Sequence, residues 1–193
     1  PRANDVYGTD DYYNYVVSFT QTNNIYDKWV RSSAINKIYY NPAITYRPWS
    51  NSDGSSMGNA SITCAPHNPV KTARGCRNLT VNNTQSAYWD RYTNAADFGD
   101  VGTYNNYAYD GSNNKTFWPS FYYQFTGDIN STASKENAAN YTRVEIKSAN
   151  APFTGSTERS DCAAAPTCTY AEEIQNFANW YTYYRSRILL ARA

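Results

Sequence analysis

The chain has 193 residues, of which 41% are hydrophobic, and its 17 Lys and Arg nearly balance its 16 Asp and Glu. This length suits one domain with its own core. Because no basic or acidic block occurs, the sequence gives no support to electrostatic binding of nucleic acid or of an anionic membrane. It also contains no long apolar run and therefore predicts no membrane-spanning helix.

Aromatic residues make up a large share of the hydrophobic residues, 17% of the chain against 41%. The chain contains 20 Tyr, 5 Trp and 7 Phe, whereas Leu occurs only at Leu79, Leu189 and Leu190. We therefore expect a core built from aromatic rings rather than from aliphatic side chains.

Three elements are predicted in the first 49 residues. Alternation in "DDYYNYVVSF" indicates a strand from Tyr12 to Phe19. Ile25 and Trp29 have helical spacing, which favours a short helix. The β-branched and aromatic residues of "INKIYYNPAITYRPW", on both sides of the turn at Asn41–Pro42, favour two short extended segments.

A long loop follows at residues 50–83, where almost no large apolar residue occurs. Two strands are predicted after it. The first covers Phe117 to Phe125, with Pro119 at an edge or a bulge. The second is "YTRVEIK", residues 141–147, in which Thr142, Val144 and Ile146 share one face of the strand and Arg143, Glu145 and Lys147 share the other.

The last segment predicts one long helix over residues 169–193. Thr169 as N-cap and Glu172 three residues later form a capping-box pattern. An apolar stripe at helical spacing indicates packing against the core; it consists of Ile174, Phe177, Trp180 or Tyr181, Tyr184 and Ile188. Since no Gly, Asn or Pro stops the helix and the chain starts without Met, we expect it to be a piece of a larger protein.

Four cysteines form two local pairs, and local pairing predicts the disulfides Cys64–Cys76 and Cys162–Cys168. Zinc binding is disfavoured because neither pair has the usual ligand spacing and His67 is the only His. Disulfides are typical of an oxidising compartment, which predicts export to the periplasm or the cell exterior.

Two motifs of the sequence only partly match known metal-binding patterns. "SDGSSMG", residues 52–58, resembles the D-x-S-x-S metal motif of von Willebrand A-type domains but has Met57 at its last position, which favours a simple turn. "DGSNN" could present the oxygens of Asp110 and Asn113 to calcium, yet no bidentate Glu follows. We therefore expect no bound metal, with calcium at Asp110 and Asn113 as the alternative.

No catalytic residue is indicated either. The single His67 lies between prolines, and no nucleophile elbow is present. We therefore predict a protein that is not an enzyme. The alternative is a secreted carbohydrate-binding or carbohydrate-active domain, which would need two facing carboxylates from Asp90, Asp97, Asp100, Asp110 and Asp128.

Four blocks of the sequence carry a resemblance. They are "NKIYYNPAITYRPW", "NASITCAPHNP", "NYTRVEIKS" and "RSDCAAAPTCTYAEEIQNFANWYTYYRSRILLARA". In this order they resemble the large tip-associated adhesins of bacterial type IV pili, the PilC/PilY proteins. The resemblance covers most of residues 35–193 and is most specific at "NFANWYTYYRSR".

The resemblance implies a segment of the N-terminal von Willebrand A-like region of such an adhesin. It implies roles in pilus biogenesis, in adhesion and in surface recognition at the pilus tip. The expected partners are minor pilins, a host or abiotic surface, and the rest of the parent chain. Because the family's metal motif and calcium loop have no counterpart here, no metal ligand is carried over.

We therefore predict an α+β fold, a single domain or insert region over residues 1–193. It would have a small, mainly antiparallel sheet, long disulfide-stapled loops and one long C-terminal helix. Its function would be non-enzymatic adhesion at the outer cell surface, through Tyr-, Trp- and Asn-rich loops. A self-associating subunit of an extracellular filament is the other alternative.

Overall fold

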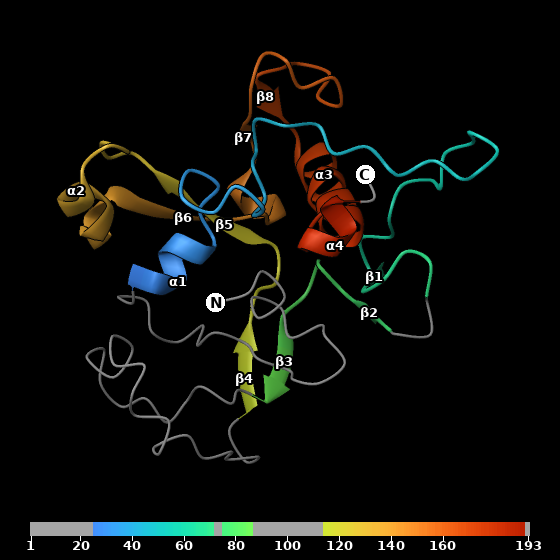
Figure 1. The fold of residues 1–193 in the computed structure, drawn as a ribbon, viewed down its shortest axis with the longest axis horizontal. Helices are drawn as coiled ribbons and strands as arrows, with labels where there is room; N and C mark the ends of the chain where they lie inside the picture. Colours follow the sequence, from blue (N-terminus) through green and yellow to red (C-terminus); the bar gives the residue numbers. More distant parts are fainter. Residues whose placement is uncertain (1–24, 72–74, 87–113, 192–193) are drawn as a thin grey trace.

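The computed structural model describes residues 25–71, 75–86 and 114–191. Its longest helix, α3 (Tyr170–Tyr183), is packed among segments from the rest of the chain (Figure 1). The other helical elements are α1 (Ile25–Val30), α2 (Thr132–Glu136), α4 (Arg187–Leu190) and the 3-10 turns η6 (Ala138–Asn140) and η7 (Ser148–Asn150). The predicted strand at residues 12–19 and the calcium candidates Asp110 and Asn113 lie outside the described residues.

The α+β class is confirmed, with small antiparallel sheets. In the described ranges the strands form separate pairs: β1 (Ala65–Pro66) with β2 (Cys76–Arg77), β3 (Asn83–Ser86) with β4 (Asn114–Phe117), β5 (Phe121–Phe125) with β6 (Tyr141–Glu145), and β7 (Phe153–Thr154) with β8 (Thr167–Cys168). The β5–β6 pair runs in register from Phe121 opposite Glu145 to Phe125 opposite Tyr141.

Pro119 changes the predicted strand at residues 117–125. The structure has β4 up to Phe117 and β5 from Phe121, with a bend between them. Proline has no N–H to donate to a ladder, so the run splits into two strands that pair with different partners. The single strand predicted there is wrong.

The strand predicted at residues 141–147 ends two residues early, at Glu145. Ile146 follows it and is fully buried, with its N–H donating to the carbonyl of Ser120 at 2.9 Å. Thr142 is exposed, so the apolar face of the prediction holds only at Val144 and Ile146.

The region around Asn41–Pro42 has turns at residues 37–39 and 42–44, where the first predicted extended segment and the start of the second would lie, whereas residues 45–49 contain no turn. α1 forms as predicted, but residues 31–49 contain no strand. Asn41 explains part of the difference, because its side-chain oxygen accepts the N–H of Ala43 at 3.0 Å and closes a local turn.

The start of the C-terminal helix is confirmed in detail. The hydroxyl of Thr169 accepts the N–H of Glu172 at 3.3 Å, and the Glu172 carboxylate accepts the N–H of Thr169 at 2.7 Å, which completes the capping box. The pKa of Glu172 is lowered because its carboxylate accepts N–H groups from Ala163 and Thr169.

The end of that helix differs from the prediction of one helix to residue 193. α3 stops at Tyr183, and α4 begins at Arg187. The Arg185 guanidinium donates to the carbonyl of Tyr181 and to the carbonyl of His67, each at 2.5 Å. Ser186 then caps the new turn, since its hydroxyl accepts the N–H of Leu189 at 3.2 Å.

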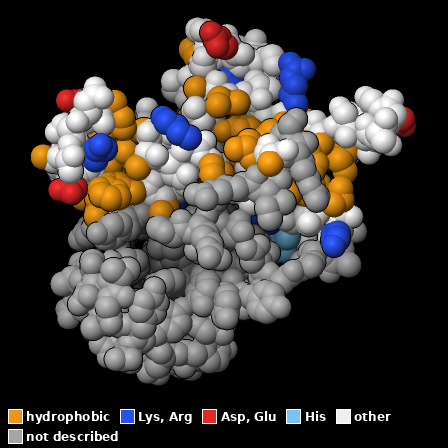
Figure 2. Space-filling view, viewed as in Figure 1, with side chains coloured by type: hydrophobic (Ala, Val, Ile, Leu, Met, Phe, Trp, Pro, Cys, Tyr) orange, Lys and Arg blue, Asp and Glu red, His pale blue; other side chains and the backbone are white. Residues whose placement is uncertain are grey.

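The core is aromatic, as predicted. The centre of the Trp180 ring lies 4.9 Å from that of Tyr39 and 5.1 Å from that of Phe177. The indole N–H of Trp180 donates to the carbonyl of Ile38 at 2.9 Å. These spacings are those of favourable ring pairs. α3 is buried around most of its second half rather than along one stripe, with residues 176–183 all buried. Figure 2 shows hydrophobic side chains (orange) on the described surface, both in the middle of the view and on the left-hand lobe.

A second, smaller core lies under α1. It is formed by Phe121, Tyr123 and Tyr141, with Trp29 of α1 packed against them. The guanidinium of Arg143 lies 3.9 Å from the centre of the Phe121 ring, a cation–π contact.

The stapled loop at residues 50–83 is confirmed. The disulfides pair Cys64 with Cys76 and Cys162 with Cys168, as predicted. Residues around 50–58 form a hairpin that projects from the body (Figure 1). At its tip the Asp53 carboxylate accepts the N–H and the hydroxyl of Ser55, which lowers its pKa. This is turn chemistry, as predicted.

Within the described part of the chain, no helix is long and apolar enough to cross a membrane.

Candidate functional site

A polar groove of about 510 Å³ runs beside the first half of α3. Its other walls are the chain at residues 45–48 and the loop at residues 160–161. It is lined by Thr45, Tyr46, Arg47, Pro48, Asn59, Ser160, Asp161, Ala171, Glu172, Gln175, Asn176 and Asn179. Most of these residues carry an amide, carboxylate, hydroxyl or guanidinium group, and these groups can hydrogen-bond to a ligand.

The floor of the groove is made by two asparagines of α3 that bind the backbone of the opposite wall. Asn176 accepts the N–H of Tyr46 at 2.7 Å and donates to the carbonyl of Ile44 at 2.8 Å. Asn179 accepts the N–H of Ala60 at 2.9 Å and donates to the carbonyl of Tyr46 at 3.0 Å. These amides fix both ends of the projecting hairpin to the helix.

The rim offers groups that remain accessible. Arg47, Asn59 and Ser160 are exposed, and Gln175 is half-buried. Arg47 donates to the Ser160 hydroxyl at 3.2 Å across the groove. The rim therefore combines a cation, amides and a hydroxyl above a fixed floor.

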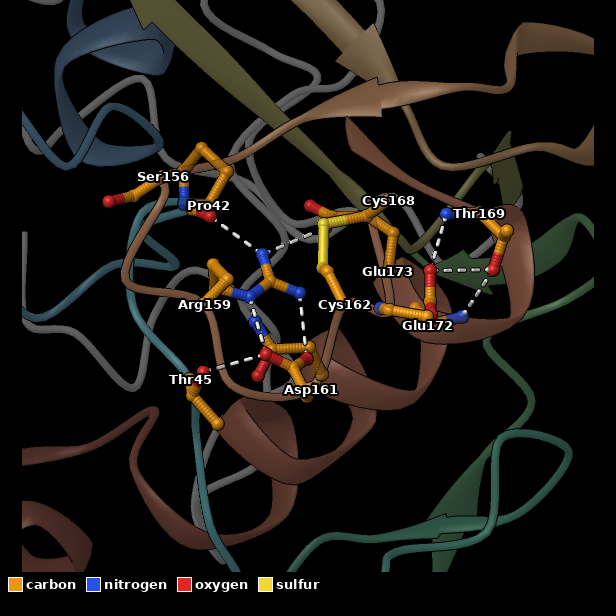
Figure 3. Close-up of a disulfide and its surroundings, with 12 residues drawn as sticks. Pro42, Thr45, Ser156, Arg159, Asp161, Cys162, Cys168, Thr169, Glu172 and Glu173 are labelled. Atoms are coloured by element: carbon orange, nitrogen blue, oxygen red, sulfur yellow. Dashed lines mark hydrogen bonds and ion pairs between the residues drawn. A yellow bond between two sulfur atoms is a disulfide. The ribbon is translucent and has the colours of Figure 1, made fainter. Parts of the chain in front are cut away.

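A buried ion pair lies behind the groove, next to the Cys162–Cys168 disulfide (Figure 3). The side chains of Arg159 and Glu173 are fully buried, and their charged atoms are 3.0 Å apart. Arg159 also donates to the carbonyl of Pro42 at 2.6 Å and holds both carboxylate oxygens of Asp161, at 2.7 and 2.8 Å. Tyr40 donates to the other Glu173 oxygen at 2.7 Å.

The electrostatics of this network follow from burial and pairing. Burial alone would lower the pKa of Arg159, but the hydrogen bonds that it donates to Asp161, together with the nearby Tyr40 and Glu173, raise it. Burial raises the pKa of Glu173 in spite of Arg159. Burial would also raise the pKa of Asp161, yet hydrogen bonds from Arg159 and Thr45 lower it below its ordinary value. The carboxylates of Glu173 and Asp161 thus already accept hydrogen bonds from donors of the protein itself.

Gly155 allows the close approach of this loop to the ion pair. A Cβ at that position would lie 2.9 Å from the carbonyl oxygen of Pro42 and 3.3 Å from the guanidinium of Arg159. The loop that carries the disulfide therefore passes directly over the guanidinium, and only glycine fits there without displacing it.

Of the carboxylates that a carbohydrate-active domain would need, only Asp128 belongs to the described residues. Asp90, Asp97, Asp100 and Asp110 lie outside the described residues. Asp128 is exposed in a turn, where it accepts the N–H of Asn130. Among the described residues no group of three or more His, Cys, Asp or Glu is placed to hold a metal.

The sequence did not identify Arg159 or Glu173 as a pair. The capping-box pattern involves Thr169 and Glu172 but not Glu173, and no motif includes Arg159. No local pattern links them, because Tyr40 and Pro42, which complete the network, are more than a hundred positions away.

His67 is half-buried in a second polar cluster. Its Nδ1 lies 2.8 Å from the hydroxyl of Tyr181, to which Arg77 also donates at 3.3 Å. Burial lowers the pKa of His67 to about 4, with Arg185 and Arg77 acting in the same direction. The imidazole is therefore neutral at neutral pH.

This pKa predicts an acid sensitivity that depends on one residue. The unfolded chain binds a proton at His67 below pH about 6.5 while the folded chain does not, so the free energy of unfolding falls as pH falls from 6.5 toward 4. Because the imidazole is only partly buried, solvent screening reduces the effect, and we expect a loss of about 1 kcal/mol between pH 7 and pH 5. Urea unfolding at the two pH values measures it. His67→Gln should remove most of the difference, and an unchanged difference would refute the assignment.

No family model, no curated protein and no solved structure matches this chain.

Proposed function

We propose that the chain is a non-enzymatic segment of a type IV pilus tip adhesin, acting in attachment or surface recognition and in pilus biogenesis outside the cytoplasm. The single observation that supports it most is the packing of the four resembling blocks. Tyr40, Ala65, Ile146 and Phe177, one from each block, belong to one core cluster. The resemblance therefore follows a folded unit rather than scattered positions.

The division between scaffold and loops supports a binding role. The asparagines of α3, the buried ion pair and both disulfides fix the loops, and the groove carboxylates already bind donors of the protein. Such a frame suits preorganised recognition of polar groups by the groove rim and the projecting hairpin. The proposed partners are minor pilins and a host or abiotic surface.

The localisation proposed here is the pilus tip or outer cell surface, reached through the periplasm. Two disulfides support folding in an oxidising compartment. Self-association as a filament subunit and carbohydrate binding or hydrolysis remain the alternatives.

A binding experiment separates these functions. The oxidised chain is immobilised and exposed to sheared type IV pili, and in parallel its own sedimentation and its hydrolysis of polysaccharides are measured. The proposal predicts saturable capture of pili that contain minor pilins and weak capture of pili that lack them. Equal capture of both, or assembly of the chain alone into filaments, would contradict it.

Arg47→Ala provides the matched variant for this experiment. The Arg47 side chain is exposed on the groove rim, where it donates to the exposed Ser160 hydroxyl, and it does not belong to the buried network. If the groove carries the binding, capture should fall while the unfolding curve stays the same. Unchanged capture would place the binding surface on another part of the chain.

A further inference from the structure

One asparagine of the chain lies in a five-residue glycosylation pattern, which is longer than the common three-residue one. The pattern Asn-x-Ser/Thr marks acceptors of N-linked oligosaccharides. It occurs at Asn59, Asn78, Asn82, Asn114, Asn130 and Asn140. Only Asn130 also has an acidic residue two positions earlier, in Asp128-Ile129-Asn130-Ser131-Thr132. This five-residue form is the one that bacterial oligosaccharyltransferases use.

The segment is open to an enzyme. It lies in the loop between β5 and α2, in a lobe away from α3 (Figure 1). Asp128, Asn130 and Thr132 are exposed, and Ile129 is 44% exposed. Within the described residues no hydrogen bond uses the side-chain amide of Asn130 or the hydroxyl of Thr132, so both groups are available.

The other described acceptor patterns lack one of these properties. Asn59 accepts from Asn179 at 3.0 Å, and the amide of Asn140 donates to the carbonyl of Ser134 at 2.8 Å. Asn78 accepts the N–H of Thr80 at 2.9 Å. Asn82 is exposed but has Thr80 two positions earlier, where the acid should stand.

The local structure can open without disturbing the core. α2 has five residues and buries none of them. A helix this short has little stability of its own. Its start is held by local hydrogen bonds of Ser134 to Ser131 and Asp128, whereas Trp29 and Tyr141 of the second core bind it further on, at the carbonyl of Lys135. Residues 128–132 can therefore become extended in an enzyme cleft while the two core clusters stay packed.

We propose that Asn130 is an N-glycosylation site, modified from a polyprenyl-pyrophosphate-linked oligosaccharide. The side-chain nitrogen of Asn130 attacks the anomeric carbon of the sugar. The new bond joins this carbon to Nδ2, the bond from the carbon to the pyrophosphate oxygen breaks, and the amide gives one proton to a base of the transferase. The lipid pyrophosphate leaves, and no oxidation occurs.

This inference goes beyond the proposed function and shares with it only export to an oxidising compartment, for which the disulfides are the support. The glycan would lie on the small lobe that holds α2, away from the groove beside α3. It would therefore shield the exposed Ile129 and leave the groove open.

The test is mass spectrometry of the full chain exported to the periplasm of cells that contain a bacterial oligosaccharyltransferase and its lipid-linked oligosaccharide. We expect one glycan mass on the peptide with Asn130 and none in cells without the transferase. Asn130→Gln and Asp128→Ala should each abolish it. Asn82→Gln is the matched control at an exposed acceptor pattern without the acid, and it should change nothing.

An unmodified Asn130 in oxidised protein from these cells would overturn the proposal, as would a glycan that persists in Asn130→Gln. A glycan that persists in Asp128→Ala would overturn the role of the acid. The substitutions lie in an exposed turn, and circular dichroism with disulfide mapping shows whether each variant is folded. Because export is supplied by the host cells, failure here is distinguishable from failure of the adhesion proposal.

Discussion

Arg159→Met should lower the free energy of unfolding by about 3–5 kcal/mol, because it leaves the Glu173 carboxylate buried without its cation. The lost contacts also include the Pro42 carbonyl and both oxygens of Asp161. Urea unfolding at pH 7 under oxidising conditions measures the change.

The control uses the same substitution at a partly exposed ion pair. Arg143 lies 2.8 Å from Glu145, and both side chains are about a quarter exposed. Arg143→Met should lower the free energy of unfolding by less, about 1–2 kcal/mol, because it removes this ion pair and the cation–π contact with Phe121. Equal effects of the two substitutions would show that the Arg159 network does not hold the loops together.

Trp180→Ala should have the second large effect, also about 3–5 kcal/mol, because it empties the centre of the aromatic core. Trp180 is 1% exposed and contacts Tyr39 and Phe177. Its replacement also leaves the carbonyl of Ile38 without its donor. Thermal and urea unfolding both report the loss.

Leu190→Ala serves as the control for Trp180→Ala. Leu190 is 46% exposed, so its truncation should change the free energy of unfolding by about 0.5 kcal/mol or less. A small effect of Trp180→Ala, similar to that of Leu190→Ala, would contradict the placement of α3 at the centre of the fold.

The features that sequence reasoning predicted correctly depend on neighbours in the chain. The capping box joins Thr169 and Glu172, three residues apart, and each disulfide closes a short loop. An aromatic core followed from composition, because few aliphatic side chains are present. Such local or compositional signals can be read without knowing the fold.

The features that could not be predicted from the sequence depend on contacts between residues far apart in the chain. α3 ends at Tyr183 where Arg185 turns to bind the carbonyl of His67, 118 positions earlier. The burial of Glu173 depends likewise on Tyr40 and Arg159. A charged residue in the first helical turn is usually solvated, so the sequence alone favoured a surface position for Glu173.

The groove was missed for a related reason. The sequence indicated recognition by aromatic loops, yet Tyr39, Tyr40, Tyr46 and Trp49 are all buried. The accessible groups of the groove are polar, and Asn176 and Asn179 build its floor from one helix face. Only the pairing of that face with residues 44–60 reveals the site.

Attachment by living cells tests the proposed function most directly. A piliated strain that produces this chain is compared with the same strain in which residues 1–193 are deleted in frame, by counting pili per cell and cells attached to a surface. We expect a loss of attachment or of piliation that the wild-type gene restores. Normal piliation together with normal attachment in the deletion strain would contradict it.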